Sequence, residues 1–398
     1  MTDLAGRAEI RLGGGAEDGY GAVADVFVEN FRSRGDLGAA CAVYVDGQKV
    51  VDLWAGLANA RTGRPWEAET SAVIFSCSKG LVAICAYLLA QEGRLELDAP
   101  VARYWPGFAP HGKAAITVRQ VLSHRAGLPA LDRDLSVDEV AAWEPVVRAI
   151  EAQAPLWEPG TGHLYHAMTY GWLIGEVIRR ITGLTPGAWF RRAVGDRLGL
   201  RTWIGLPDPA PVPVAFMEAP LPDEDSEDAR ESARIAAANR TVERSLTMGG
   251  AFEFPACGRY VTFNDPAIQH AEIPAANGIS TARSLARAYA ACVSDVEGPR
   301  LLSARSVEDA LVEQSGGAQL SGMPDDGARW GTGFQLASPP GQPMLGPRSF
   351  GHAGAGGQLG FADDEHRVGF AYLSNQMGGY GDARARLLTL AVRSILHG

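Results

Sequence analysis

Residues 80–89 are apolar at almost every position, and this run constrains the fold more than any other segment. A helix that is apolar all round has to be covered on every side, so other elements must pack around it. Ser76-Cys77-Ser78-Lys79 stands directly before the run and would form the first turn of that helix. The sequence therefore predicts a serine and a lysine at the start of a buried helix.

Ser76 and Lys79 are three residues apart, so on a helix their side chains lie on one face and can meet. A serine hydroxyl becomes a strong nucleophile only when a nearby base takes its proton. A lysine can be that base if burial or a cationic neighbour lowers its pKa. Only three of the 36 basic residues are lysines, and arginine does not deprotonate in proteins. We interpret Ser76 as a nucleophile activated by Lys79; the alternative is a helix-capping serine and a solvated lysine.

Strand-like segments lie near both ends of the chain, with a mainly helical middle between them. A helix is expected at 17–34 and a hairpin at 41–54, turning at Asp46-Gly47-Gln48. Near the other end, strands are expected at 330–336, 350–361 and 367–374, and a helix at 382–396. This order predicts an α/β fold of the α+β kind, with one sheet assembled from both ends and a helical insertion.

Composition narrows the classes of partner. The chain has 398 residues and a formal charge of −10, which disfavours nucleic acid and anionic membranes as partners. The first residues lack the apolar core of a signal peptide, and no run reaches transmembrane length. Five cysteines form no C-x-x-C pair, which favours free thiols. We therefore expect a soluble cytoplasmic protein of the size of an enzyme.

Other hydrolytic chemistries lack their sequence signatures. There is no H-E-x-x-H, and the eight histidines do not cluster at metal-ligand spacing. No serine stands in G-x-S-x-G; the nearest segment, 278–282, ends in alanine. The sequence therefore predicts neither a metal site nor an α/β-hydrolase nucleophile.

A catalytic serine also needs a proton shuttle and donors for the oxyanion. Tyr165 follows a break in the chain at 157–161, and a phenol beside a lysine ammonium would have its pKa lowered. His352-Ala353-Gly354-Ala355 is almost free of bulk, so a backbone N–H there could approach an acyl oxygen closely. The alternatives are an ordinary half-buried tyrosine and a strand histidine satisfied by a neighbour.

Ser76-x-x-Lys79, Tyr165-x-x and His352-x-Gly354 together resemble the three motifs of the serine β-lactamase and penicillin-binding protein superfamily, in order and in spacing. Residues 116–128 and 276–281 are similar to further segments of that superfamily. Within that superfamily, the overall sequence pattern most resembles that of the class C-like esterases, the carboxylesterases of family VIII.

The resemblance implies a sandwich domain of residues 1–75 and 276–398 beside a mainly helical domain of residues 76–275, with the site between them. It implies that Ser76 is acylated, that Lys79 shares its proton, and that Tyr165 is general base in acylation and acid toward the leaving group. The N–H groups of Ser76 and Ala355 would form the oxyanion hole. His352 would support Tyr165 or the leaving group, with no metal or cofactor.

Two departures from the superfamily pattern bear on the substrate. Ala167 stands where β-lactam-cleaving members usually have Asn, and His352 where they usually have Lys. A neutral histidine offers no permanent cation to a substrate carboxylate, so we expect a small uncharged ester as substrate. The alternatives are a β-lactamase or D-Ala-type peptidase or amidase, an acyltransferase, and an acyl-binding sensor without turnover. The residues expected to line the substrate pocket are Gly354, Trp157, Trp330 and Phe361.

Overall fold

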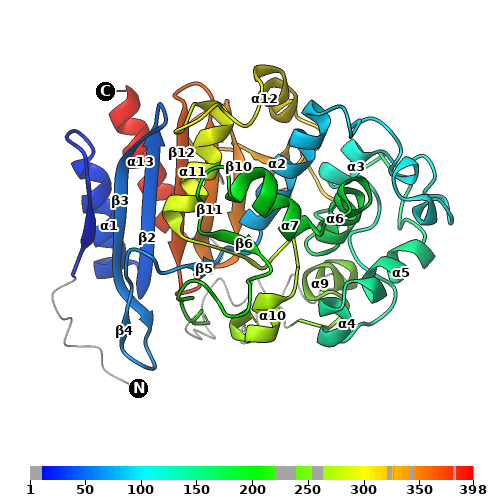
Figure 1. Cartoon of the computed structure of the whole chain (residues 1–398), viewed down its shortest axis with the longest axis horizontal. Helices are drawn as coiled ribbons and strands as arrows, with labels where there is room; N and C mark the ends of the chain where they lie inside the picture. Colours follow the sequence, from blue (N-terminus) through cyan, green and yellow to red (C-terminus); the bar gives the residue numbers. More distant parts are fainter. Residues whose placement is uncertain are drawn as a thin grey trace.

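The computed structural model of this chain describes residues 11–219, 239–252, 263–320, 325, 327–339, 342, 344–379 and 382–397. Within these residues an antiparallel sheet runs in the order β1-β3-β2-β12-β11-β10-β9-β8, with β4 paired to β3. Strands from the two ends of the chain meet where β2 pairs with β12 (Figure 1). This confirms the expected α+β architecture.

The strands of this sheet are β1 (Gly13–Ala16), β2 (Gly38–Val45), β3 (Gln48–Asn59), β4 (Arg64–Pro65), β8 (Arg329–Trp330), β9 (Gln335–Leu336), β10 (Ser349–Gly354), β11 (Gln358–Asp363) and β12 (Val368–Ser374). A second, small sheet has the order β5-β7-β6. Its strands are β5 (Ala72–Val73), β6 (Thr202–Ile204) and β7 (Gly278–Ser280).

The expected hairpin at 41–54 is present, and its turn is explained by the backbone. Asp46 and Gly47 both have positive φ, 49° and 77°, as a two-residue turn matched to the twist of its strands requires. Two expected single strands are instead hairpins. Residues 350–361 contain the turn between β10 and β11, where Gly356 and Gly357 have φ of 78° and 99°. Residues 330–336 likewise fold back between β8 and β9.

The two faces of the large sheet are covered by different helices. On one face α1 (Gly21–Ser33) and α13 (Arg384–His397) lie together and enclose one buried cluster with the sheet (Figure 1). On the other face α11 (Ala282–Val293) packs against β2, β11 and β12. That face belongs to the larger buried cluster, which extends to the helices of the middle of the chain. The proposed domain boundaries at 76 and 275 stay a prediction.

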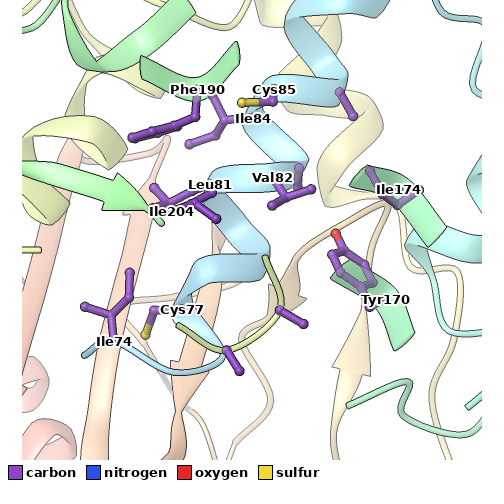
Figure 2. Packing of buried hydrophobic residues seen from close by; sticks show 14 of the residues in the cluster. Ile74, Cys77, Leu81, Val82, Ile84, Cys85, Tyr170, Ile174, Phe190 and Ile204 are labelled. Carbon is purple, nitrogen blue, oxygen red and sulfur yellow. The ribbon is translucent and has the colours of Figure 1, made fainter. Parts of the chain in front are cut away.

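Helix α2 (Cys77–Gln91) is the buried helix that the sequence predicts. Its residues from Cys77 to Leu89 are all buried. Side chains of α6 (Thr169–Thr182), α7 (Pro186–Phe190) and β6 pack around it, including Ile174, Phe190 and Ile204 (Figure 2). The helices of the middle and later parts of the chain are α3 (Val118–Leu122), α4 (Val137–Ala141), α5 (Glu144–Ala152), α6 (Thr169–Thr182), α7 (Pro186–Phe190), α9 (Arg240–Thr247), α10 (Pro266–His270) and α12 (Ala304–Leu311).

Two further sequence expectations concern membranes and thiols. Among the helices within the described residues, none combines the length and apolar character that crossing a membrane requires. Cys41, Cys77, Cys85 and Cys292 are buried free thiols. Cys257 lies outside the described residues.

A buried ion pair anchors α13 to the loop before β2. Arg384 donates to Asp36 at 2.6 Å, and Asp36 also accepts from Tyr372 at 2.6 and 2.7 Å and from Ser374 at 2.9 Å. Replacing Arg384 by Met leaves this carboxylate buried without its cation, so we expect a loss of about 3–5 kcal/mol in the free energy of unfolding. Urea denaturation measures it. The double variant Arg384→Met/Asp36→Asn should recover part of that loss; a double variant as unstable as the sum of both single changes would contradict the pairing.

Candidate active site

Ser76 lies at the start of α2, and its side chain does not cap the helix. It is the N-cap residue of the helix, yet its hydroxyl makes no capping hydrogen bond. The preceding residue, Phe75, has a φ of 44°, a conformation that a bulky residue adopts only under constraint. Ser76 remains partly exposed, whereas its neighbours in the chain are buried. The capping interpretation of Ser76 is therefore wrong.

Lys79 is fully buried directly beside this hydroxyl. Its Nζ donates to Ser76 Oγ at 3.1 Å and to the carbonyl oxygen of Ala275 at 2.9 Å. Burial holds the pKa of Lys79 well below its ordinary value, because an ammonium loses its hydration there. The interpretation of Lys79 as a solvated side chain is also wrong, and its amine can be neutral near neutral pH.

Tyr165 completes a cluster of three polar side chains. Its phenol shares a hydrogen bond with Ser76, and Lys79 Nζ lies 4.9 Å from the centre of its ring. Burial, the largest influence, raises the pKa of Tyr165 above its ordinary value, and the hydrogen bond from Ser76 opposes this only in part. The expected lowering of this pKa by a lysine ammonium is thus corrected. Burial therefore favours a neutral amine and a protonated phenol in the free enzyme.

Strand β10 lies against the N-terminus of α2 and brings the third motif to the site. The Cys77 thiol donates to the His352 carbonyl oxygen at 3.0 Å. A Cβ on Gly354 would lie 2.5 Å from the carbonyl oxygen of Ile74, so only glycine allows this approach. Ala355 follows at once and begins the turn before β11. As the residue at the helix start, Ser76 has an N–H that the helix itself leaves without a partner.

His352 is neutral in this setting. Its Nδ1 donates to the carbonyl oxygen of Ala353 at 2.5 Å, since a carbonyl can only accept. Burial and the nearby Lys79 lower the pKa of His352 to about 3. The other ring nitrogen, Nε2, is buried without a hydrogen-bond partner among the described residues. A neighbour therefore satisfies only one of the two nitrogens.

Comparison with known proteins places this site in a family. The family model described as "Beta-lactamase" matches residues 24–393. The chain belongs to the beta-lactamase family. It is therefore a serine hydrolase of the β-lactamase fold, and the expected superfamily is confirmed.

Individual members of the family resemble the chain over nearly its whole length. The chain is 35% identical to "Esterase/beta-lactamase LipL" of Mycobacterium tuberculosis, over 92% of this chain and 83% of that protein. The crystal structure of a family VIII carboxylesterase has a TM-score of 0.82 at 32% identity, covering 97% of this chain and all of that one. A penicillin-binding protein homologue from Caulobacter crescentus has a TM-score of 0.83 at 32% identity, with the same coverage.

The aromatic residues expected in the pocket of this beta-lactamase family member lie in three different places. Trp330 stacks on Tyr165 with ring centres 5.1 Å apart. Trp157 is half-buried and meets the ring of His166, edge to face, at 6.2 Å. Phe361 is corrected: it is fully buried and stacks on Phe370, in the cluster under α1 and α13. Successive residues of a strand point to opposite faces, and Phe361 points to the face away from α2.

Two residues around the motifs, Ala275 and His124, were not predicted from the sequence. Ala275 supplies the carbonyl oxygen that holds Lys79, and it directly precedes the family-like segment 276–281. His124 lies in the family-like segment 116–128, and its ring meets Tyr165 edge to face at 4.8 Å. Across the described part of the chain, no three His, Cys, Asp or Glu residues are grouped as a metal ion would need.

Proposed function

We propose that the protein is a carboxylesterase that cleaves small uncharged esters through an acyl-enzyme on Ser76. One observation carries the proposal: a fully buried lysine with a lowered pKa donates to a partly exposed serine hydroxyl at 3.1 Å. A neutral amine at this distance can accept the serine proton through its lone pair, and the serine remains within reach of a substrate.

In acylation Ser76 Oγ attacks the ester carbonyl while Lys79 takes its proton. The N–H groups of Ser76 and Ala355 stabilise the negative oxygen of the tetrahedral intermediate. The protonated phenol of Tyr165 then gives its proton to the departing alkoxide. The Lys79 ammonium returns a proton to Tyr165, which restores both groups and leaves the acyl group on Ser76. Tyr165 thus acts as the acid, and Lys79 as the first base.

Deacylation uses Lys79 as the base for water, and it needs no proton from Tyr165, because no alkoxide has to be protonated in this step. Water attacks the acyl carbon, and its proton reaches Lys79. The tetrahedral intermediate collapses, the carboxylic acid leaves, and Ser76 Oγ takes back a proton from Lys79. One ester and one water become one acid and one alcohol, and every proton is carried by groups of this chain.

The preference for an uncharged ester is supported by the third motif. Family members that cleave β-lactams usually present a lysine where this chain has His352, whose pKa is lowered to about 3. A charge-assisted hydrogen bond to a substrate carboxylate is therefore missing, which would cost about 1.5–3 kcal/mol. The other departure, Ala167, likewise presents no side-chain amide. Similarity to proteins named as esterases supports the same substrate class.

A panel of esters tests the proposal. We expect the pure protein to hydrolyse short-chain nitrophenyl and alkyl esters, with D-amino-acid amides and nitrocefin turned over far more slowly. The name "Esterase/beta-lactamase" of one relative makes β-lactam hydrolysis the second candidate. Nitrocefin turnover equal to ester turnover would favour that candidate, and acylation without product release would favour a sensor. The cytoplasmic setting stays a prediction from composition.

Replacing Tyr165 by Phe tests the assignment of the acid. We expect kcat for an alkyl ester to fall about 10²- to 10³-fold with little change in KM, because the proton for the leaving alkoxide is lost. A nitrophenyl ester should lose much less, since nitrophenolate leaves without a proton. Steady-state kinetics on a matched ester pair measures this. Equal losses on both esters, or a loss confined to KM, would contradict the role.

A further inference from the structure

The segment that carries Tyr165 has no regular structure of its own. Residues 162–166 belong to neither a helix nor a strand. Their buried N–H and C=O groups therefore need partners outside a helix or sheet ladder. The position of the Tyr165 phenol depends on those partners, because they hold the backbone that carries it.

His124 supplies two of these partners from the turn after α3. Its ring nitrogen Nδ1 accepts from the N–H of His166 at 3.2 Å, and its carbonyl oxygen accepts from the N–H of Leu164 at 3.2 Å. The two bonds lie on either side of Tyr165. The ring of His124 also meets the ring of Tyr165 at 4.8 Å and that of Trp330 at 4.6 Å.

The His124 ring is in one defined state. Burial holds its pKa well below the ordinary value, so the ring is neutral. Nδ1 accepts a hydrogen bond, so the single ring proton is on Nε2. His124 also has a φ of 63°, in the left-handed region that is uncommon for residues other than glycine, although Asn, Asp and His adopt it more often than most. Such strain persists only where the surrounding structure holds it, and it is frequent at functional sites.

Ser245 and Gln319 bind the same segment from other sides. Ser245, a buried residue of α9, donates from its hydroxyl to the Tyr165 carbonyl oxygen at 3.1 Å and accepts from the Ala167 N–H at 3.1 Å. The side-chain oxygen of Gln319 accepts from the Tyr165 N–H at 3.0 Å. Both backbone groups of Tyr165 are thus held by side chains from distant parts of the chain.

We propose that His124 and Ser245 are positioning residues for the proton transfer by Tyr165. They fix the backbone of the segment 164–167 and so place the phenol beside Ser76 and the leaving group. This inference rests on the proposed function, since it names the residues that align its acid. Neither side chain touches the reacting atoms in this scheme; both act through Tyr165.

Two substitutions of His124 separate positioning from a structural role. His124→Asn keeps an acceptor near the place of Nδ1 and tolerates positive φ. His124→Leu has a similar bulk but no acceptor. We expect the Leu variant to lose about 10- to 100-fold in kcat for an alkyl ester, because small misplacements of a catalytic group are costly. The Asn variant should stay within about threefold of the parent on that ester.

If Tyr165 is displaced as the acid, the loss in kcat should depend on whether the leaving group needs a proton. The kcat of the Leu variant should fall far less for a nitrophenyl ester than for an alkyl ester, as we expect for Tyr165→Phe. The KM of the Leu variant should change little for either ester. Ser245→Ala should show the same pattern on the same segment, so the inference stays testable if the Leu variant does not fold. Equal losses on the two esters in folded variants, or full alkyl-ester activity in both, would overturn the proposal.

A readout without substrate keeps this inference separate from the proposed function. The ring carbon bearing the hydroxyl of Tyr165 can be labelled with ¹³C and its resonance assigned with Tyr165→Phe. We expect one sharp resonance in the parent and in His124→Asn, and a shifted or broadened one in His124→Leu and Ser245→Ala. An unchanged resonance in both of the latter would overturn the positioning role. A parent that cleaves no ester would instead refute the proposed function alone.

Discussion

Replacing Ser76 by Ala abolishes ester hydrolysis, with an expected loss in kcat of at least about 10⁴-fold, as for other hydrolases that lose their nucleophile. The hydroxyl lies 3.1 Å from Lys79 Nζ and hydrogen-bonds to Tyr165, so both partners lose the atom on which they act. Alanine fits the same backbone conformation, and the protein should fold as before. Steady-state kinetics on an alkyl ester measures the loss.

Ser71→Ala is the matched control for this change. Ser71 is a fully buried serine five positions earlier, and its hydroxyl has no hydrogen-bond partner within the described residues. We expect its kcat and KM to equal those of the parent. More than about one hundredth of parental activity in purified Ser76→Ala would show that another group is the nucleophile.

Replacing Lys79 by Met should lower kcat/KM about 10³-fold, because the base that takes the serine proton is lost. Methionine has a similar length and no charge, so it fills the space that the buried lysine leaves. For the parent we expect kcat/KM to rise with pH through the lowered pKa of Lys79, since only the neutral amine accepts a proton. The Met variant should lack this rise.

The substitution Lys79→Met should also change how the free energy of unfolding depends on pH, in a direction that the lowered pKa of Lys79 fixes. In the unfolded chain Lys79 keeps an ordinary pKa of about 10.4 and is protonated where the folded protein is not. Between the lowered folded pKa and that value, the unfolded state binds more protons, so the stability contributed by Lys79 rises with pH. From urea denaturation we expect the free energy of unfolding of the parent, relative to that of Lys79→Met, to increase from pH 7 to pH 9.5. A decrease of this difference with pH would contradict a buried neutral amine.

Lys113→Met controls for burial of a lysine in itself. Lys113 is also fully buried, but its amine donates to backbone carbonyl oxygens of Glu151 and Gln153. No serine hydroxyl is among the partners of its amine within the described residues. We expect stability to change and kcat to remain. A comparable fall in kcat would mean that the Lys79 result reports folding and not proton transfer.

Features that depend on residues close together in the chain could be predicted from the sequence, and features that depend on distant residues could not. The spacing of Ser76 and Lys79 is fixed by helix periodicity, and the apolar run behind them requires burial, so both were predictable. Tyr165 and His352 are 89 and 276 positions beyond Ser76 (165 − 76 and 352 − 76). Their own sequence context left structural alternatives open, and the order of the family motifs decided between them. The structure brings Tyr165 and His352 to the same helix end, with their ring centres 6.0 Å apart.

The errors have a physical cause in each instance. The pKa shift of Tyr165 was expected with the wrong sign because it depends on whether Lys79 carries a proton, and burial decides that. Phe361 was expected in the pocket because alternation along a strand does not tell which face meets the helices. His124 was missed because its contacts with the segment of Tyr165 join residues about 40 positions apart.

Acid-quenched peptide mapping during turnover tests the central claim most directly. The pure protein is mixed with excess short-chain ester, stopped in the first turnovers and digested. We predict one peptide heavier by the mass of the acyl group, with the modification on Ser76, and its loss as the ester is consumed. Turnover with no acylated peptide, or with the acyl group on another residue, would contradict a serine that acts through the neutral amine beside it.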